Sequence, residues 1–257
     1  MKNRKSEDLS PKVLLILSLL AGVVMLALPG CHRTITTANK PNRTLVITAP
    51  FTTGQISVDG NLDEPCYHTP PLVEDFVIAG QPGKQPSKTK AWLFWQRDKL
   101  IFAFDCEDAD LVAVPPSSKK HDVDRQDRVE LFLWSGQPQD TYYCIEIGGR
   151  GALHDYAARF YRRFDDGWSL EGLEYAVMRT YRGYSVEGTI SRTAMEKMGF
   201  SLEPDTQWRV GLFRADFATS NGDGEPNWIT WIDAKCPKPD FHVAESFGTC
   251  TLGPYKE

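Results

Sequence analysis

From about residue 44 onward, short runs of aromatic and β-branched residues alternate with clusters of turn-forming residues, and this alternation constrains the fold most strongly. Aromatic and β-branched runs favour strands, whereas the Gly-, Pro- and Asp-rich segments between them favour turns. The expected strands are residues 91–95, 100–104, 129–134, 142–147, 175–180, 184–190, 208–214, 229–232 and 248–252.

Helical periodicity is scarce in the same region. The best candidate is 192–198, which Ser191 would cap and Gly199 would end. No long linker or low-complexity segment divides residues 44–257. The sequence therefore predicts one all-β domain over 44–257: a two-sheet antiparallel β-sandwich of jelly-roll or immunoglobulin-like type, with one short helix.

Residues 1–30 have the pattern of a signal peptide. A basic start precedes residues 13–28, which carry no charge and are shorter than the roughly 20 residues that span a bilayer as a helix. The run ends in Leu28-Pro29-Gly30-Cys31, which resembles the lipobox of bacterial lipoproteins. This resemblance implies cleavage before Cys31, lipidation of Cys31 and a lipidated tether over 31–43. An uncleaved membrane anchor and an ordinary secretory signal are the alternatives.

The predicted export gives the charge and the cysteines a context. Removing residues 1–30 takes away four basic and two acidic side chains, so the net charge falls from −5 to −7. An acidic domain is a poor nucleic-acid binder, because phosphate recognition needs a basic face. Five cysteines remain, and this odd number leaves at least one free thiol, for which Cys144 in an apolar strand is favoured. The expected location is the bacterial cell envelope, at the outer membrane or facing the periplasm.

Several polar residues lie beside the predicted strands. Asp59 and Asp63 bracket a tight turn, which either reflects turn chemistry alone or offers oxygen ligands to calcium. Glu130 alternates with the apolar residues of its strand, so it can point out of the core. A glycine-rich turn over 148–151 interrupts the next strand and would carry Arg150 towards Glu130.

In their order along the chain, these segments are similar to the family 9 carbohydrate-binding modules. The motifs that carry the resemblance are residues 56–65, 127–130, 148–151, 186–190, Trp208-Arg209, Phe241-His242 and Phe247-Gly248. The family's tryptophan slot in the first motif holds Tyr67. The resemblance covers about residues 44–254 and implies a β-sandwich that binds the end of a sugar chain between two tryptophans.

The resemblance also implies which residues bind. For the sugar they are Glu130 as hydroxyl acceptor, Arg150 as donor, Asn227 as a second polar contact, and Trp228 or Trp231 as an aromatic wall. Structural calcium is also common in the family, and the candidate ligands in this sequence are Asp59, Asp63 and Asp127, although Asp127 could instead only orient its strand. No organic cofactor is expected. An indole covers the apolar C–H face of a pyranose, while a carboxylate and a guanidinium pair with its hydroxyls.

One position departs from the family pattern. The second tryptophan of the family lies three residues before the Asp of the 127–130 motif, and that position is Asp124. The aromatic clamp therefore lacks one wall unless Trp168 or a tyrosine replaces it.

The sequence thus favours a non-catalytic carbohydrate-binding lipoprotein that captures glycans at the cell envelope for catabolism, alongside glycoside hydrolase partners. A glycoside hydrolase is one alternative, although Asp127 and Glu130 are three apart and a strand would put them on opposite faces. A haem-binding sandwich with His121, His154 or His242 as axial ligand is another. A surface assembly protein with a degenerate sugar site is the third.

Overall fold

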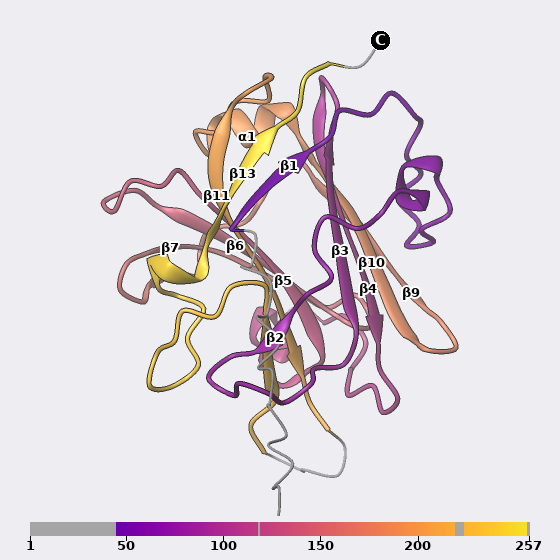
Figure 1. Cartoon of the computed structure of the whole chain (residues 1–257), viewed down its shortest axis with the longest axis vertical. Helices are drawn as coiled ribbons and strands as arrows, with labels where there is room; N and C mark the ends of the chain where they lie inside the picture. Colours follow the sequence, from indigo (N-terminus) through magenta and orange to yellow (C-terminus); the bar gives the residue numbers. More distant parts are fainter. Residues whose placement is uncertain (1–44, 118, 219–223, 256–257) are drawn as a thin grey trace, which may run out of the picture. The chain divides into compact units, whose positions relative to one another are not determined.

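The computed structural model describes residues 45–117, 119–218 and 224–255, and these form a β-sandwich, as the sequence predicts (Figure 1). The nine-stranded sheet has seven strands in the order β1 (Val46–Ala49), β13 (Gly248–Leu252), β11 (Gln207–Asp216), β5 (Arg128–Trp134), β6 (Tyr142–Gly148), β7 (Leu153–Arg159) and β8 (Arg163–Asp165). The other two strands lie off this path: β12 (Asn227–Thr230) pairs with β11, and β2 (Val77–Ile78) pairs with β12. The four-stranded sheet runs in the order β3 (Thr89–Trp95), β4 (Lys99–Glu107), β10 (Gly183–Ser191) and β9 (Leu173–Arg179).

All nine predicted strands are present, although their ends shift by a few residues. Four further strands, β1, β2, β7 and β8, were not predicted, and three of them are only two to four residues long. The described strands pair antiparallel, as predicted for the sandwich, except at one edge, where β1 pairs with β13 in parallel. These two strands lie at opposite ends of the domain sequence, so no hairpin fixes their relative direction.

The predicted helix is confirmed as α1 (Arg192–Lys197). Ser191 caps it, since its Oγ accepts a hydrogen bond from the backbone N–H of Ala194 at 3.3 Å. The described residues also include the 3₁₀ turns η1 (Pro65–His68), η2 (Lys120–Arg125) and η4 (Ala244–Ser246). Across the described residues, we find no helix with the length and apolar character needed to span a bilayer.

The main core lies between the two sheets. In β5, Val129, Leu131 and Leu133 point inward and join the core cluster with strands of the other sheet. Because side chains alternate along a strand, Arg128, Glu130 and Phe132 then point to the outer face of the nine-stranded sheet. Yet every residue of β5 is buried, so this outer face is covered as well.

A second aromatic cluster covers part of that outer face. The segment before β13 brings Phe241 and Phe247 onto Phe132 and Phe213. The rings of Phe213 and Phe241 stack with centroids 4.1 Å apart and planes 10° apart. Such stacking fixes the segment against the sheet. The covered region ends beside the polar residues of β5, which leaves a hollow there.

Several expectations concern the start of the chain and the cysteines. The predicted signal peptide, Cys31 and the tether lie outside the described residues. The five cysteines of the domain are free thiols, and Cys144 is buried, in agreement with the prediction for that residue.

Candidate functional site

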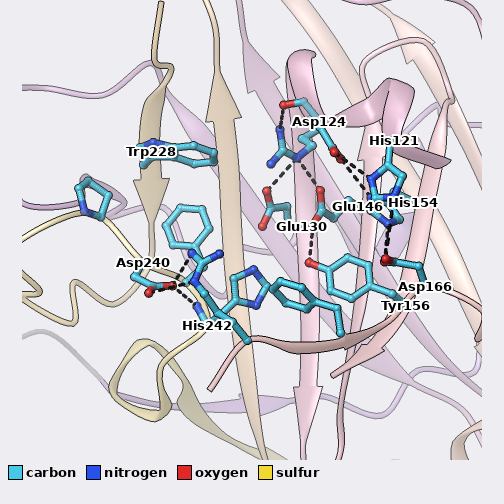
Figure 2. Close-up of a pocket in the computed structure, with 15 residues that line it drawn as sticks. His121, Asp124, Glu130, Glu146, His154, Tyr156, Asp166, Trp228, Asp240 and His242 are labelled. Atoms are coloured by element: carbon cyan, nitrogen blue, oxygen red, sulfur yellow. Dashed lines mark hydrogen bonds and ion pairs between the residues drawn. The ribbon is translucent and has the colours of Figure 1, made fainter. Parts of the chain in front are cut away.

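A pocket of about 320 Å³ opens on the outer face of the nine-stranded sheet, beside the aromatic cluster (Figure 2). Strands β5, β6 and β7 form its floor, and β12, η2 and the segments around 162–166 and 239–242 form its walls. Its volume lies at the small end of the range for small-molecule sites.

The floor of the pocket is a polar row that crosses three neighbouring strands. In the register of the sheet, Glu130 of β5 lies opposite Glu146 of β6, and Glu146 lies opposite His154 of β7. Arg128 precedes Glu130 by two residues, and Tyr156 follows His154 by two, so both share the same face. The sheet therefore fixes these five side chains side by side.

Arg128 holds the two carboxylates of the floor together. Its Nε lies 2.7 Å from Glu146 Oε2 and 2.9 Å from Glu130 Oε1, and all three side chains are at most 7% exposed. The hydroxyl of Tyr156 donates to Glu146 Oε1 at 2.6 Å. Burial first, and then the charge of Glu146, raise the pKa of Glu130 to about 8. Glu130 is therefore mostly protonated at neutral pH and can both donate and accept a hydrogen bond.

The floor has hydrogen-bonding capacity that the protein does not use. Among the described residues, Glu130 Oε1 and Arg128 Nε have no aligned hydrogen-bond partner, although Arg128 Nε lies within ion-pair distance of both Glu130 and Glu146. Buried polar atoms normally have hydrogen-bond partners, so two atoms without one in the same pocket point to an external partner.

Trp228 forms one wall. It is half-buried, and its ring meets Phe241 edge to face at 5.5 Å and 87°. The guanidinium carbon of Arg128 lies 5.6 Å from the centroid of the Trp228 ring. Aromatic surface thus stands directly beside the polar floor, as Figure 2 shows.

A charged segment bounds the pocket near His242. Arg162 Nη2 pairs with Asp240 Oδ1 at 2.9 Å, and Tyr161 donates to Asp240 Oδ2 at 2.6 Å. Burial, reinforced by the nearby charge of Arg162, lowers the pKa of His242 to about 3. His242 is therefore neutral at physiological pH, and its Nδ1 lies 3.1 Å from the hydroxyl of Tyr142.

The opposite wall contains a group that we call the His/Asp quartet: His121, Asp124, His154 and Asp166 (Figure 2). Asp124 Oδ2 lies 3.0 Å from His121 Nδ1, and its Oδ1 lies 3.1 Å from His154 Nδ1. Asp166 lies 3.3 Å from His154 Nε2 and 3.9 Å from His121 Nε2. Burial opposes ionisation of Asp124, but hydrogen bonds from the two histidines outweigh it and lower the pKa of Asp124.

The structure brings two of the predicted sugar contacts, Glu130 and Trp228, into the pocket. Arg150 is exposed in the turn between β6 and β7 and does not line the pocket. That turn is held elsewhere, because Gly149 N–H donates to the carbonyl of Asp127 at 2.8 Å. Arg128 takes the place that the prediction gave to Arg150.

Asn227 and Trp231 are also placed away from the pocket. The side chain of Asn227 accepts from Lys84 Nζ at 2.8 Å and donates to Asp216 at 3.3 Å. Trp231 is 2% exposed and packs in the core against Gly248, where a Cβ atom would lie only 2.2 Å from the indole. Of the two tryptophans considered for the wall, Trp228 is therefore the one in the pocket.

Sequence reasoning missed Arg128, Glu146 and Tyr156 and considered His154 only as a haem ligand. Arg128 had a usable signal, since its spacing of two from Glu130 puts both on one face. The other three become neighbours only through the pairing of β5, β6 and β7. Trp168, considered as a replacement wall, instead packs against Tyr143 with ring centroids 5.0 Å apart.

Two groups of side chains in the described residues have the spacing to hold a metal ion. One comprises His121, Asp124 and His154; the other comprises Asp108, Asp127 and Asp216. Asp59 and Asp63, two of the three predicted calcium ligands, belong to neither group.

The turn that contains Asp59 is fastened to the four-stranded sheet by hydrogen bonds. The backbone N–H groups of Asp59 and Gly60 donate to Glu187 Oε2 at 3.1 and 3.2 Å, and Tyr67 donates to Glu187 Oε1 at 2.9 Å. Glu187 is fully buried on β10, so these bonds fasten the turn to the four-stranded sheet. Asp63 accepts from Asn61 Nδ2 at 2.6 Å.

The group around Asp127 suits a hard cation in its donor atoms, since all three residues offer carboxylate oxygens. Arg214 pairs with Asp108 at 3.0 Å and with Asp216 at 2.6 Å. Asp127 itself accepts hydrogen bonds from the backbone N–H groups of Val112 and Phe217. Asp127 thus faces the interior of the sandwich, whereas Glu130 faces the pocket.

An indole beside two carboxylates and a guanidinium on one face of a β-sandwich is an arrangement that suits the apolar face and the hydroxyl groups of a sugar. The sequence profile described as carbohydrate family 9 binding domain-like matches residues 58–254. The chain therefore belongs to this family, which confirms the predicted resemblance and, at the level of the family, non-catalytic carbohydrate binding.

Solved structures show the same fold. A family 9 carbohydrate-binding module from Caldicellulosiruptor kristjanssonii with glucose has a TM-score of 0.58 at 14% identity, covering 82% of this chain and 97% of its own. The cellotriose complex gives a TM-score of 0.56 at 15% identity, with 82% and 95% covered. A Bacteroides uniformis protein provisionally described as carbohydrate-binding has a TM-score of 0.59 at 14% identity, and the match covers 80% of this chain and 98% of that protein. Among curated proteins, no sequence matches this chain significantly.

Proposed function

We propose that the pocket binds the end of a glucose-containing oligosaccharide without cleaving it. The observation that carries this proposal is the position of Trp228 beside Arg128, Glu130 and Glu146. The indole would cover the apolar face of a terminal sugar ring, and the orphaned atoms of Arg128 and Glu130 would bind its hydroxyl groups. Glucose and cellotriose, bound by structurally similar modules, are the first ligands to test.

The small pocket volume favours a chain end over a long internal stretch. Titration calorimetry of the purified full-length chain with glucose, cellobiose, cellotriose and a panel of other glycans tests this. We expect affinity to level off after one or two sugar units. Recovery of each sugar unchanged after incubation separates binding from hydrolysis, and absence of binding to the whole panel contradicts the proposal.

A matched pair of arginine variants locates the site. Arg128→Gln leaves the floor carboxylates without their cation, so sugar binding should be lost. Arg150→Gln makes the same chemical change on the exposed turn and should bind as the wild type does. Equal loss of binding in both variants, or in neither, would place the sugar elsewhere.

We further propose that the chain is exported and anchored to the bacterial cell envelope through Cys31. The charge-free run before Cys31 and the lipobox-like sequence support this proposal. Cys31→Ser should abolish incorporation of labelled fatty acid and release the protein from the membrane fraction. In that location, captured glycans would be supplied to glycoside hydrolases, and stimulation of a hydrolase on the bound glycan by the wild type but not by Trp228→Ala tests the partnership.

A structural calcium ion is proposed at Asp108, Asp127 and Asp216. The three carboxylates lie within reach of one ion and would supply oxygen ligands that tie β11 to the start of β5. Metal analysis and thermal unfolding with calcium or a chelator test this. Calcium should raise the melting temperature of the wild type but not that of Asp127→Asn, and equal melting in both conditions contradicts the proposal.

A further inference from the structure

We propose that the His/Asp quartet holds a divalent transition-metal ion of the zinc type at the pocket wall opposite Trp228. His121, His154 and Asp124 would bind the ion, and Asp166 would orient both imidazoles. This site differs in place and chemistry from the carboxylate group around Asp127, and it does not depend on the sugar that the pocket binds.

The spacing of the donor atoms fits one ion. Metal–ligand bonds of about 2.0–2.2 Å in a tetrahedral site place neighbouring ligand atoms about 3.3–3.6 Å apart. Asp124 already lies 3.0 and 3.1 Å from Nδ1 of His121 and His154, and the three donor atoms all lie within 4.8 Å of one another. Small movements of exposed side chains would bring them around a common centre.

The two imidazoles are arranged with the correct nitrogen facing each carboxylate. Both Nδ1 atoms face Asp124, and both Nε2 atoms face Asp166. When Nδ1 of each ring binds a metal, Nε2 carries the proton; that of His154 donates to Asp166 at 3.3 Å, and that of His121 faces Asp166 at 3.9 Å. Metal-bound histidines usually donate their second N–H to such a carboxylate, which fixes the tautomer and the ring orientation.

Charge and donor type select the class of metal. Two neutral imidazoles, two carboxylates and a divalent cation sum to zero charge, so the loaded quartet introduces no net charge into the wall. Imidazole nitrogen suits zinc, copper, nickel and cobalt, whereas calcium and magnesium prefer oxygen. The quartet is thus selective for transition metals.

The quartet is accessible yet anchored. The side chains of His121, Asp124 and Asp166 are 65%, 47% and 48% exposed, so an ion can reach them from solvent. His154 is 6% exposed and is fixed on β7. Because three residues bind the ion and the quartet lines the pocket, a fourth coordination position would face the pocket space.

The test is a titration of the full-length chain, purified without a polyhistidine tag, with Co²⁺ while its visible absorption is recorded. Replacement of water by imidazole nitrogen changes and strengthens that absorption, and added Zn²⁺ should reverse it by displacing Co²⁺. His121→Ala, an exposed position that does not threaten folding, should abolish the signal. Asp166→Asn should weaken binding by about 10–100-fold.

His68→Ala is the matched control, because His68 is an exposed histidine on η1 outside the pocket. It should bind Co²⁺ as the wild type does. The proposal is overturned if the wild type leaves the Co²⁺ spectrum unchanged, or if His121→Ala binds as tightly as His68→Ala. Circular dichroism of each variant confirms that a lost signal is not lost structure.

Discussion

Replacing Trp228 or Trp231 by alanine distinguishes a tryptophan of the pocket from a tryptophan of the core, although the two are only three positions apart in the sequence. Trp228 is half-buried and lines the pocket, so a bound sugar ring would cover its open surface. Covering about 80 Å² of apolar surface at about 25 cal/mol per Å² contributes about 2 kcal/mol. Trp228→Ala should therefore raise the Kd for a bound oligosaccharide by about thirtyfold, measured by calorimetry.

Trp231→Ala should show the opposite profile. Trp231 is 2% exposed, and its loss leaves a cavity beside Gly248 and Ile232. Truncating a buried tryptophan costs about 3–5 kcal/mol of unfolding free energy. In a domain of this size, that loss lowers the melting temperature by roughly 6–20 °C. Below its melting temperature, Trp231→Ala should bind sugar within a few-fold of the wild type.

The melting temperature of Trp228→Ala should change much less than that of Trp231→Ala, because the site is half-exposed. The reasoning is refuted if Trp228→Ala folds normally and binds as tightly as the wild type. It is also refuted if Trp231→Ala keeps its stability but loses binding, since the core tryptophan would then be the sugar platform.

Three further predictions follow from the same contacts. Because the pKa of Glu130 is raised to about 8 in the folded state, its contribution to stability is complete below the unfolded pKa near 4.5 and is lost as the pH rises through about 8. The unfolding free energy of the wild type minus that of Glu130→Gln, measured with urea, should therefore fall between pH 5 and pH 8 by at most about 1.4 kcal/mol per pH unit. A difference that stays constant with pH would contradict the raised pKa of Glu130. Gly60→Ala should cost at least about 1 kcal/mol of stability without changing the Kd, because Gly60 has a φ of 84° and an added Cβ would lie 2.8 Å from the backbone N of Met178. Arg150→Ala should leave both the Kd and the melting temperature within error of the wild type, and a weaker affinity would return Arg150 to the site.

The fold was largely predictable because its strands carry local signals. Alternating β-branched and aromatic residues indicated β3, β4, β5 and β10, and Ser191 with Gly199 bounded the helix. β7 escaped prediction because it carries His154, Asp155 and Arg159 among its apolar residues. Both faces of β7 are nonetheless covered, and only the tertiary structure reveals which polar residues have partners there.

The site was predictable only in part, for a reason that lies in the sheet. Glu130 and Trp228 stood out by type and by their neighbours in the sequence, whereas Glu146 and His154 acquire their place from the register of β5, β6 and β7. The sequence suggested that a glycine turn would carry Arg150 to Glu130. The hydrogen bond from Gly149 to Asp127 instead holds the turn outside the pocket. The local sequence of the turn does not predict this hydrogen bond.

The two parts of the pocket are therefore subject to different constraints. Arg128, Glu130 and Glu146 are buried in paired strands, so their positions are set by the same register that holds the sheet together. The walls come from η2, β12 and connecting segments, which can change without disturbing that register. At Asp124, where the family resemblance expects an aromatic side chain, the chain has a carboxylate between two imidazoles instead. Under the proposed function, this polar wall would contact sugar hydroxyl groups through hydrogen bonds in the place where an aromatic side chain would stack on the ring.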